Sequence, residues 1–175
     1  PNSVTYIESG AFAGCPKLTN MVVENENRVY DSRDNCNAII ETASNTLIQG
    51  CKNTIIPNSV TSIGEIAFGE CLSLTSINIP NSVISIEYAA FNGCSSLTSL
   101  DIPNNVQTIG KNAFRNCSSI ESVIIGKSVA SIGENAFANC NSIKSVTWNA
   151  KHCSSFGICY IGYIDGELFQ IFDSS

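Results

Sequence analysis

Apolar residues recur every 23 positions along most of this chain. In "PNSVTSIGEIAFGECLSLTSINI" (57–79) they occupy eight places: Val60, Ile63, Ala67, Phe68, Cys71, Leu74, Ile77 and Ile79. The next segment, "PNSVISIEYAAFNGCSSLTSLDI" (80–102), repeats the pattern, and further copies occupy residues 103–125, 126–148 and 1–23. Self-similarity at this spacing predicts a solenoid in which each copy forms one coil and buries its apolar side against its neighbours.

Within each copy the pattern predicts two extended pieces joined by a tight turn. The segment "LTSINI" (74–79) ends in period-two alternation, which is typical of a short strand, and "VTSI" (60–63) is a second extended piece. Between them, "GEIAFGEC" (64–71) is too short for an independent helix, so we expect a single helical or 3₁₀ turn that carries Ala67 and Phe68 inward. The expected fold is a right-handed repeat solenoid of about six coils with one parallel sheet, whose segments end at Val23, Ile79, Ile102, Ile125 and Trp148.

Most of the cysteines hold the same position in successive copies, which is not the spacing of a disulfide framework. Stacked strands lie about 4.7–4.9 Å apart, but parallel side chains hold their Cβ atoms farther apart than a disulfide allows. We therefore expect buried thiols that fill a tight corner as small residues and weak donors, and not zinc ligands, because no CxxC pair is present. Five cysteines share this column: Cys15, Cys71, Cys94, Cys117 and Cys140. The state of four others is left open: Cys36, Cys51, Cys153 and Cys159.

Single glycines also recur in a fixed column. Gly64, Gly110 and Gly133 each follow the second extended piece of a copy. We interpret them as turn positions that favour a positive φ, which glycine adopts without steric cost.

Residues 24–56 interrupt the period, because they take 33 places where a copy takes 23. The runs "NAIIET" (37–42) and "TLIQG" (46–50) flank the turn-prone "ASN" (43–45), which predicts a β-hairpin. We expect a lengthened coil whose hairpin projects from one edge, either to add specificity or as a plain spacer. Within it, "DSRDNCN" (31–37) has Asp31 and Asn35 in two positions of a calcium loop, but Arg33 and Thr42 stand where ligands are needed. An Asx turn is the favoured interpretation.

The periodic solenoid is expected to span residues 1–148, and residues 149–175 are expected to cap it. In "ICYIGYIDGELFQIF" (158–172), two apolar runs flank Asp165 and Gly166, which predicts a second hairpin. His152, Cys153 and Cys159 lie nearby, but a zinc site would lack a fourth ligand. Because the sequence begins inside the repeat pattern without a methionine or a signal peptide, we expect it to be a piece of a longer protein.

Composition and charge narrow the function classes. The chain has 43% apolar and 14% charged residues, a net charge of −6 and only nine Lys plus Arg, which gives no basis for binding nucleic acid or an anionic membrane. No apolar run reaches 18 residues, so membrane insertion is not expected. Neither a nucleophile with its base, nor a carboxylate pair, nor a phosphate-binding loop can be assembled, so we expect no enzyme, no cofactor and no metal.

The outward positions of the predicted sheet form a polar strip, which is the candidate binding surface on the concave sheet face. It varies in charge and lacks aromatic residues, which favours a protein contact over a sugar platform, although Ser and Thr also suit solvated strands. The alternatives left open are carbohydrate binding and a purely structural spacer, and the solenoid ends allow self-association. The candidate residues are Thr75, Ser76, Asn78, Thr98, Ser99, Asp101, Glu121, Ser122, Lys144, Ser145 and Thr147.

The motif "IPNSVTSIG…AF…C…LTSI" closely resembles the treponemal-type, BspA-like leucine-rich repeat, over residues 1–148. The resemblance implies a curved leucine-rich-repeat solenoid from secreted or cell-surface proteins of host-associated bacteria and some parasitic protists. Some of these proteins are implicated in adhesion to host matrix proteins and in coaggregation. The partner implied for this chain is an extracellular or host protein of unknown identity.

Overall fold

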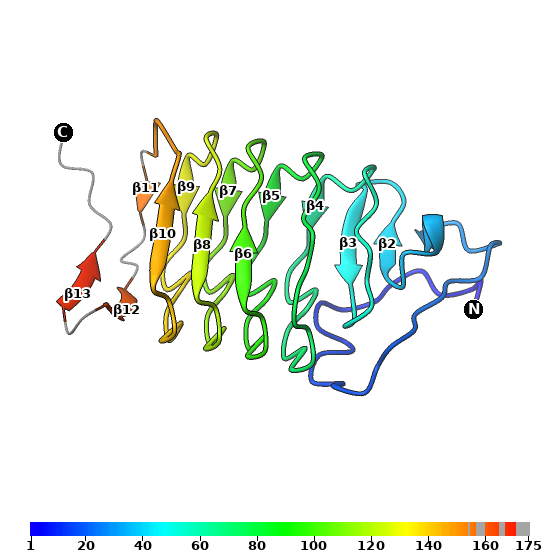
Figure 1. Cartoon of the computed structure of the whole chain (residues 1–175). Coiled ribbons are helices and arrows are strands. Elements are labelled where there is room, and N and C mark those ends of the chain that lie inside the picture. The colour runs from blue at the N-terminus through cyan, green and yellow to red at the C-terminus, as the bar shows by residue number, and fades with distance from the viewer. Residues whose placement is uncertain (154, 157–159, 165–166, 171–175) are drawn as a thin grey trace.

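The chain folds into an elongated stack of coils with a β-sheet along two of its sides (Figure 1). The computed structural model describes residues 1–153, 155–156, 160–164 and 167–170. Four regular coils occupy residues 57–148 with the predicted 23-residue register. The expected repeat solenoid is therefore confirmed, with four regular coils where about six coils were expected.

The longer sheet has eight strands and runs the length of the stack. Its order is β1-β2-β3-β4-β5-β7-β9-β11, with antiparallel pairs at β1–β2 and β2–β3 and parallel pairs from β3 onward. Equivalent residues pair across coils, as in Ile63 with Ile86 and Ile86 with Ile109. The strands are β1 (Tyr30–Asp31), β2 (Ile39–Glu41), β3 (Thr46–Gln49), β4 (Ser62–Ile63), β5 (Ser85–Ile86), β7 (Thr108–Ile109), β9 (Ser131–Ile132) and β11 (Ser155–Phe156).

The shorter sheet consists of β6 (Ser99–Asp101), β8 (Ser122–Ile125) and β10 (Ser145–Trp148), all parallel. These strands lie in the "LTSI" segments, where strands were predicted. The stack therefore has two sheets, where one was expected. No strand forms at 18–23 or 74–79, and one backbone hydrogen bond among the described residues, from Thr98 N to Thr75 O, joins 74–79 to the next coil. The shorter sheet therefore ends at β6, because a regular ladder needs successive backbone hydrogen bonds between neighbouring strands.

The two extended pieces of a coil are joined by consecutive tight turns, where a helical or 3₁₀ turn was expected. Cys71 N donates to Phe68 O within the turn, whereas Phe68 N donates to Ala90 O of the next coil. A helix cannot continue because two columns adopt positive φ, a conformation that right-handed helices exclude. These columns are Gly10, Ile66, Ala89, Asn112 and Asn135, and Gly14, Glu70, Gly93, Asn116 and Asn139.

The glycines at 64, 110 and 133 were predicted to adopt a positive φ, and this prediction is wrong. They permit close packing between coils instead. Gly64, Gly110 and Gly133 do not adopt positive φ. A Cβ at Gly133 would lie 2.3 Å from Lys111 N, and one at Gly110 would lie 2.6 Å from the carbonyl carbon of Glu87. These glycines let the backbones of adjacent coils approach each other.

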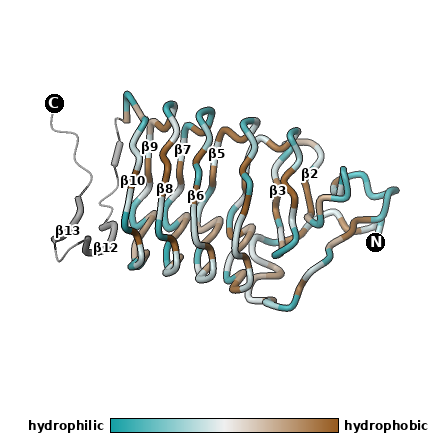
Figure 2. The backbone as a smooth tube through the Cα atoms, viewed as in Figure 1, coloured by the Kyte–Doolittle hydropathy of each residue, from teal (hydrophilic) through white to brown (hydrophobic). Residues whose placement is uncertain are grey.

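The core is a continuous apolar interior between the sheets, and a column of aromatic rings runs through it. Phe68, Phe91, Phe114 and Phe137 are buried and stack with centroid separations of 4.8, 5.2 and 5.3 Å. Figure 2 shows the hydrophilic corners of the coils at the top of the view, with apolar segments along the body of the stack. The separations match the spacing between stacked strands, so each ring covers the next.

The hairpin within residues 24–56 is confirmed, but it does not project from the stack. Its strands β2 and β3 pair antiparallel, and β3 then pairs in parallel with β4. Ile40 and Leu47 lie fully buried in the main core. The hairpin extends the eight-stranded sheet because its apolar face continues the inward columns of the regular coils.

The first copy departs from the others. Its Phe12 and Cys15 are exposed, which overturns the expectation that Cys15 is a buried thiol. Val4, Ile7 and Leu18 pack instead against a small second core that includes Tyr30, whose hydroxyl accepts a hydrogen bond from Ile7 N at 3.0 Å. The aromatic position of the first copy is therefore accessible, whereas the equivalent phenylalanines of the regular coils are buried.

After Trp148 the chain adds β11 to the eight-stranded sheet, where Phe156 pairs with Ile132. Strands β12 (Tyr160–Ile164) and β13 (Glu167–Gln170) then pair antiparallel, as predicted for the second hairpin. The predicted turn residues Asp165 and Gly166 lie outside the described residues.

Candidate functional site

The shorter sheet, the residues that lead into its strands and the neighbouring extended segment 74–79 present an outward surface, termed here the strand face, that carries every residue of the predicted polar strip. Ser99 pairs with Ser122 and Ser122 with Ser145, so these three hydroxyls form one row across the coils. Apart from Ser122, which is half-buried, the residues of the face are exposed. They are Thr75, Ser76, Asn78, Thr98, Ser99, Asp101, Glu121, Ser122, Lys144, Ser145 and Thr147.

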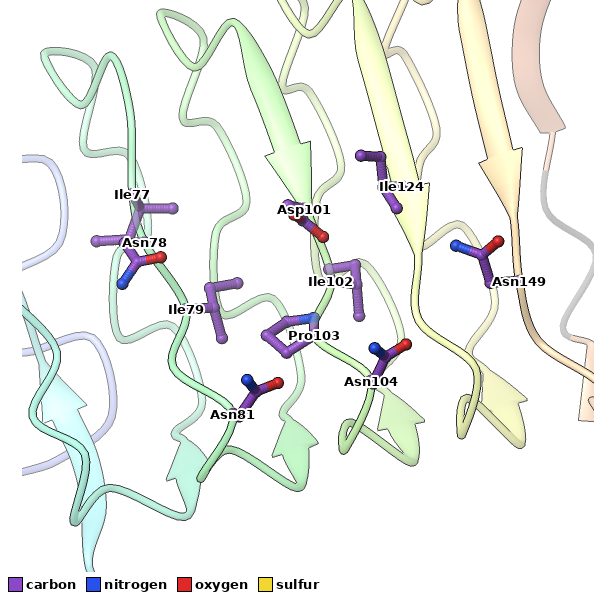
Figure 3. A pocket seen from close by; sticks show the side chains of 10 residues that line it. All are labelled: Ile77, Asn78, Ile79, Asn81, Asp101, Ile102, Pro103, Asn104, Ile124 and Asn149. Atoms are coloured by element: carbon purple, nitrogen blue, oxygen red, sulfur yellow. The ribbon is translucent and has the colours of Figure 1, made fainter.

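A hollow of about 390 Å³, termed here the amide groove, lies where the strands of this face end and the chain turns (Figure 3). Its walls combine amide groups, one carboxylate and aliphatic side chains. Of the predicted residues, Asn78 and Asp101 line it. The full lining is Ile77, Asn78, Ile79, Asn81, Asp101, Ile102, Pro103, Asn104, Ile124 and Asn149.

Gly126 lies in a corner of the chain next to this groove and is buried. The repeat places Gly126 between Pro103 and Asn149, and both of these residues line the groove. A Cβ at Gly126 would lie 2.2 Å from Pro103 O. The missing side chain therefore allows the backbones of the two corners to approach each other closely.

A second groove of about 420 Å³ continues from the first toward the N-terminus. The two share Ile77 and Asn78 among their lining residues. The second groove also contains Lys52 and Ile55, and the Ile55 side chain is 72% exposed. The two grooves adjoin at these shared residues, and the pair of grooves, termed here the channel, is lined by residues from Lys52 to Asn149.

Two exposed aliphatic residues of this face were not predicted. Ile124 pairs with Asp101 in the β6–β8 register and is 39% exposed, and Ile55 precedes Asn78 by 23 residues. The 23-residue spacing alone would have placed both in the row of Asn78 and Asp101. Ile55 was missed because residues 24–56 were treated as a single insertion.

The charges of the strand face are of two kinds. Glu121 forms an ion pair with Lys144, with 2.9 Å between Glu121 Oε1 and Lys144 Nζ, and both side chains are largely exposed. The pair therefore contributes little to stability. Within the described part of the chain, the Asp101 carboxylate forms neither an ion pair nor a hydrogen bond. Asp101 is thus the ionised group of the face that stays available to a ligand.

The "DSRDNCN" segment forms the favoured Asx turn. Arg33 N donates to Asp31 Oδ1 at 3.1 Å, and Arg33 Nε donates to the same oxygen at 2.8 Å. Partial burial on its own raises the pKa of Asp31, but the hydrogen bonds and charge of Arg33 outweigh it and hold that pKa below its ordinary value. The carboxylate is therefore neutralised by a neighbouring side chain.

No group of three or more metal-ligating side chains forms among the residues that the structure describes. Of the three residues weighed for zinc, His152 and Cys153 lie in the described part, and Cys159 lies outside it. Across the same part of the chain, no helix combines the length and apolar character that crossing a membrane requires.

The cysteine column forms a ladder of weak hydrogen bonds. Cys94 Sγ donates to Phe68 O, Cys117 Sγ to Phe91 O and Cys140 Sγ to Phe114 O, each at 3.1 Å. Each thiol thus joins its coil to the preceding one, which is the predicted role of a small residue with a weak donor. Buried, unbridged thiols are present at Cys36, Cys51, Cys71, Cys94 and Cys117.

The buried thiols should be protected from chemical labelling in the folded protein. Their raised pKa should also lower the free energy of unfolding at alkaline pH. The side-chain interaction with Cys94, together with burial, raises the pKa of Cys117 above its ordinary value. The unfolded chain loses this proton above pH ~8.5, whereas the folded chain keeps it. Stability is therefore full below that pH and falls as the pH rises above it.

Mass-spectrometric mapping after brief labelling with a thiol reagent checks this prediction. The exposed Cys15 should react in the folded protein, and Cys94 and Cys117 should react only after unfolding. The alkaline loss of stability should be smaller in a Cys117→Ala variant. Rapid labelling of Cys94 or Cys117 under native conditions would contradict the buried ladder.

The fold and the strand face define a class: a non-globular repeat protein with an open parallel-sheet surface. The sequence matches the BspA type leucine rich repeat region in six copies, over residues 1–47 and 48–159. The chain therefore belongs to the BspA-type leucine-rich-repeat family. No curated protein matches the sequence.

Solved bacterial structures share this fold. A leucine rich cell surface protein from Faecalibacterium prausnitzii is 30% identical, with a TM-score of 0.59 over 86% of this chain and 47% of that one. The T. pallidum leucine rich repeat protein is 26% identical, with a TM-score of 0.62 over 85% and 64%. The pneumococcal vaccine antigen PcpA, at 22% identity and a TM-score of 0.56 over 86% and 44%, shows the fold alone. The chain spans less than two thirds of each of these proteins.

Proposed function

We propose that this chain is a non-enzymatic interaction module of a cell-surface or secreted protein, and that its strand face binds host or partner-cell proteins. Membership of the BspA-type family supports this role, as does the similarity to a protein described as a leucine rich cell surface protein. A module of this kind needs a rigid scaffold and an accessible surface, and the stacked coils supply both.

The observation that carries the proposal is the contrast between the two sides of the shorter sheet. The inward row Ile77, Leu100, Val123 and Val146 stays aliphatic, whereas the adjacent outward row changes from Asn78 to Asp101, Ile124 and Thr147. Packing fixes the inward row, because each side chain must fill the space between its neighbours. Packing leaves the outward row free, so a partner can set its chemistry.

Blocking the strand face should weaken binding strongly while leaving the fold intact. The test variant is Ser99→Arg with Ser122→Arg, which places two bulky groups in the central row of the face. The matched control is Thr108→Arg with Ala130→Arg, because these exposed residues lie on or beside the strands of the longer sheet. Biolayer interferometry against a panel of extracellular matrix proteins and partner-cell surface proteins measures the effect.

We expect at least one panel protein to bind the parent and the control, and to lose about tenfold or more in affinity for the test variant. Circular dichroism establishes that all three proteins are folded. Equal binding by the two double variants would exclude the strand face, and the absence of binding to every panel protein would overturn the proposed function.

A further inference from the structure

The channel formed by the two grooves has a chemistry and a spacing that point to one kind of occupant. We infer that it binds an extended peptide segment with the pattern apolar-x-basic-x-apolar, lying along the solenoid axis and across the strands. This inference rests on the proposed function, because it names the part of a protein partner that the strand face recognises.

Charge complementarity selects the central residue of the peptide. Asp101 is the only acidic side chain among the described residues that line the two grooves, where Lys52 is the only basic one, and no ion pair within the described chain neutralises Asp101. Glu121, by contrast, is already paired with Lys144. A Lys or Arg of the partner would form a charge-assisted hydrogen bond with Asp101, the strong type of polar contact at an interface.

The aliphatic residues at the two sides of Asp101 select the flanking positions. Asp101 lies two coils from Ile55 and one coil from Ile124, and the long side chain of a central Lys or Arg spans its displacement from the midpoint. Ile55 and Ile124 are exposed and lie three coils apart in the same row. Three coil spacings of 4.7–4.9 Å amount to about 14 Å. In an extended peptide, residues i and i+4 lie on the same side and about 13 Å apart, so two apolar side chains at i and i+4 can contact Ile55 and Ile124 together.

The walls of the channel suit a peptide backbone. Asn78 lines both grooves, and Asn81 and Asn149 line the amide groove. An asparagine amide can both donate and accept hydrogen bonds, which a backbone with alternating N–H and C=O groups requires. A sugar ligand is less well matched, because the lining residues include no aromatic side chain for stacking.

Three fluorescein-labelled peptides test the pattern by fluorescence polarisation with the full 175-residue chain. GLSKSLG carries the inferred spacing, GLSESLG reverses the central charge, and GLSKLSG moves the second apolar residue to i+3. We expect the first peptide to bind about tenfold more tightly than either of the others. The Asp101→Asn variant should bind GLSKSLG about tenfold more weakly than the parent does, since a charged hydrogen-bond partner is lost.

Charge reversal makes the test specific to Asp101. The Asp101→Lys variant should prefer GLSESLG over GLSKSLG. An Asp34→Asn variant serves as the control, because Asp34 is also an exposed carboxylate but lies in the short 3₁₀ segment Arg33–Asn35, outside the channel. This variant should bind all three peptides as the parent does.

Equal affinity of the parent for the lysine and glutamate peptides, or an Asp101→Asn variant with unchanged affinity, would overturn the inference. If no peptide binds while panel proteins are still captured and the Ser99→Arg, Ser122→Arg variant loses them, the inference fails and the proposed function stands. If a glycan array shows binding that Asp101→Asn abolishes and the peptides do not bind, the groove is a sugar site and the inference fails. If neither the peptides nor the panel proteins bind, both the inference and the proposed function are wrong.

Discussion

Replacing Phe91 with alanine is expected to lower the free energy of unfolding by about 3–5 kcal/mol. The Phe91 ring is fully buried and stacks between Phe68 at 4.8 Å and Phe114 at 5.2 Å. Its removal leaves a cavity that both neighbouring rings line, and the coils cannot close it because their backbone ladders fix the spacing. Chemical denaturation monitored by circular dichroism measures the loss.

The first copy supplies a matched control for this variant. Phe12 holds the same place in the repeat but is 40% exposed, so Phe12→Ala should cost markedly less than Phe91→Ala. Similar losses in the two variants would show that the aromatic column does not stabilise the stack in the way described.

Replacing Gly133 with alanine is expected to destabilise the protein by about 1–3 kcal/mol, although the change adds only one methyl group. The new Cβ would lie 2.3 Å from Lys111 N and 2.6 Å from the Gly110 carbonyl carbon. Both are backbone atoms of the preceding coil, so the clash can be relieved only by separating two coils. Thermal unfolding of the two proteins measures the difference.

Gly64 provides the comparison within the same column. A Cβ there would lie 3.0 Å from Leu47 O and 3.1 Å from the Thr46 Cγ2 atom, so Gly64→Ala should be milder than Gly133→Ala. Glu87 already occupies this column in its own coil, which indicates that the requirement depends on the local approach of the preceding backbone. The reverse order of the two variants would contradict the close-approach account.

The solenoid, its register and its core could be predicted from the sequence because they follow from one periodic pattern. A residue that repeats every 23 positions meets its equivalent in the next coil, as Ile63 meets Ile86. The inward positions of Phe68 and Phe91 follow for the same reason, since the apolar columns must share one side of each coil.

The turn geometry could not be predicted in the same way. Positive φ falls on Ile66 and Ala89 as well as on asparagine and glycine, so residue type alone does not mark these columns. The role of Gly133 was misread because a close contact between coils leaves the same sequence signal as a left-handed turn. The hairpin was predicted from local pattern, but its pairing with β4 depends on residues far along the chain.

For the candidate site, the polar side chains were predicted and the apolar ones were not. Asn78 and Asp101 stand out as polar residues among aliphatic ones, whereas Ile55 and Ile124 are chemically indistinguishable from core residues in the sequence. The 23-residue spacing places both in the outward row, but the three-dimensional structure is needed to show that they border a groove.

Photo-crosslinking tests most directly the claim that the strand face is the binding surface. A photoreactive phenylalanine analogue is placed either at Ser99 on β6 or at Thr108 on β7, two exposed strand positions on different sheets. The protein is then irradiated together with the panel protein that binds it. The account predicts a cross-linked complex from position 99 and none from position 108. Cross-linking from position 108 alone would contradict it and would place the binding surface on the eight-stranded sheet.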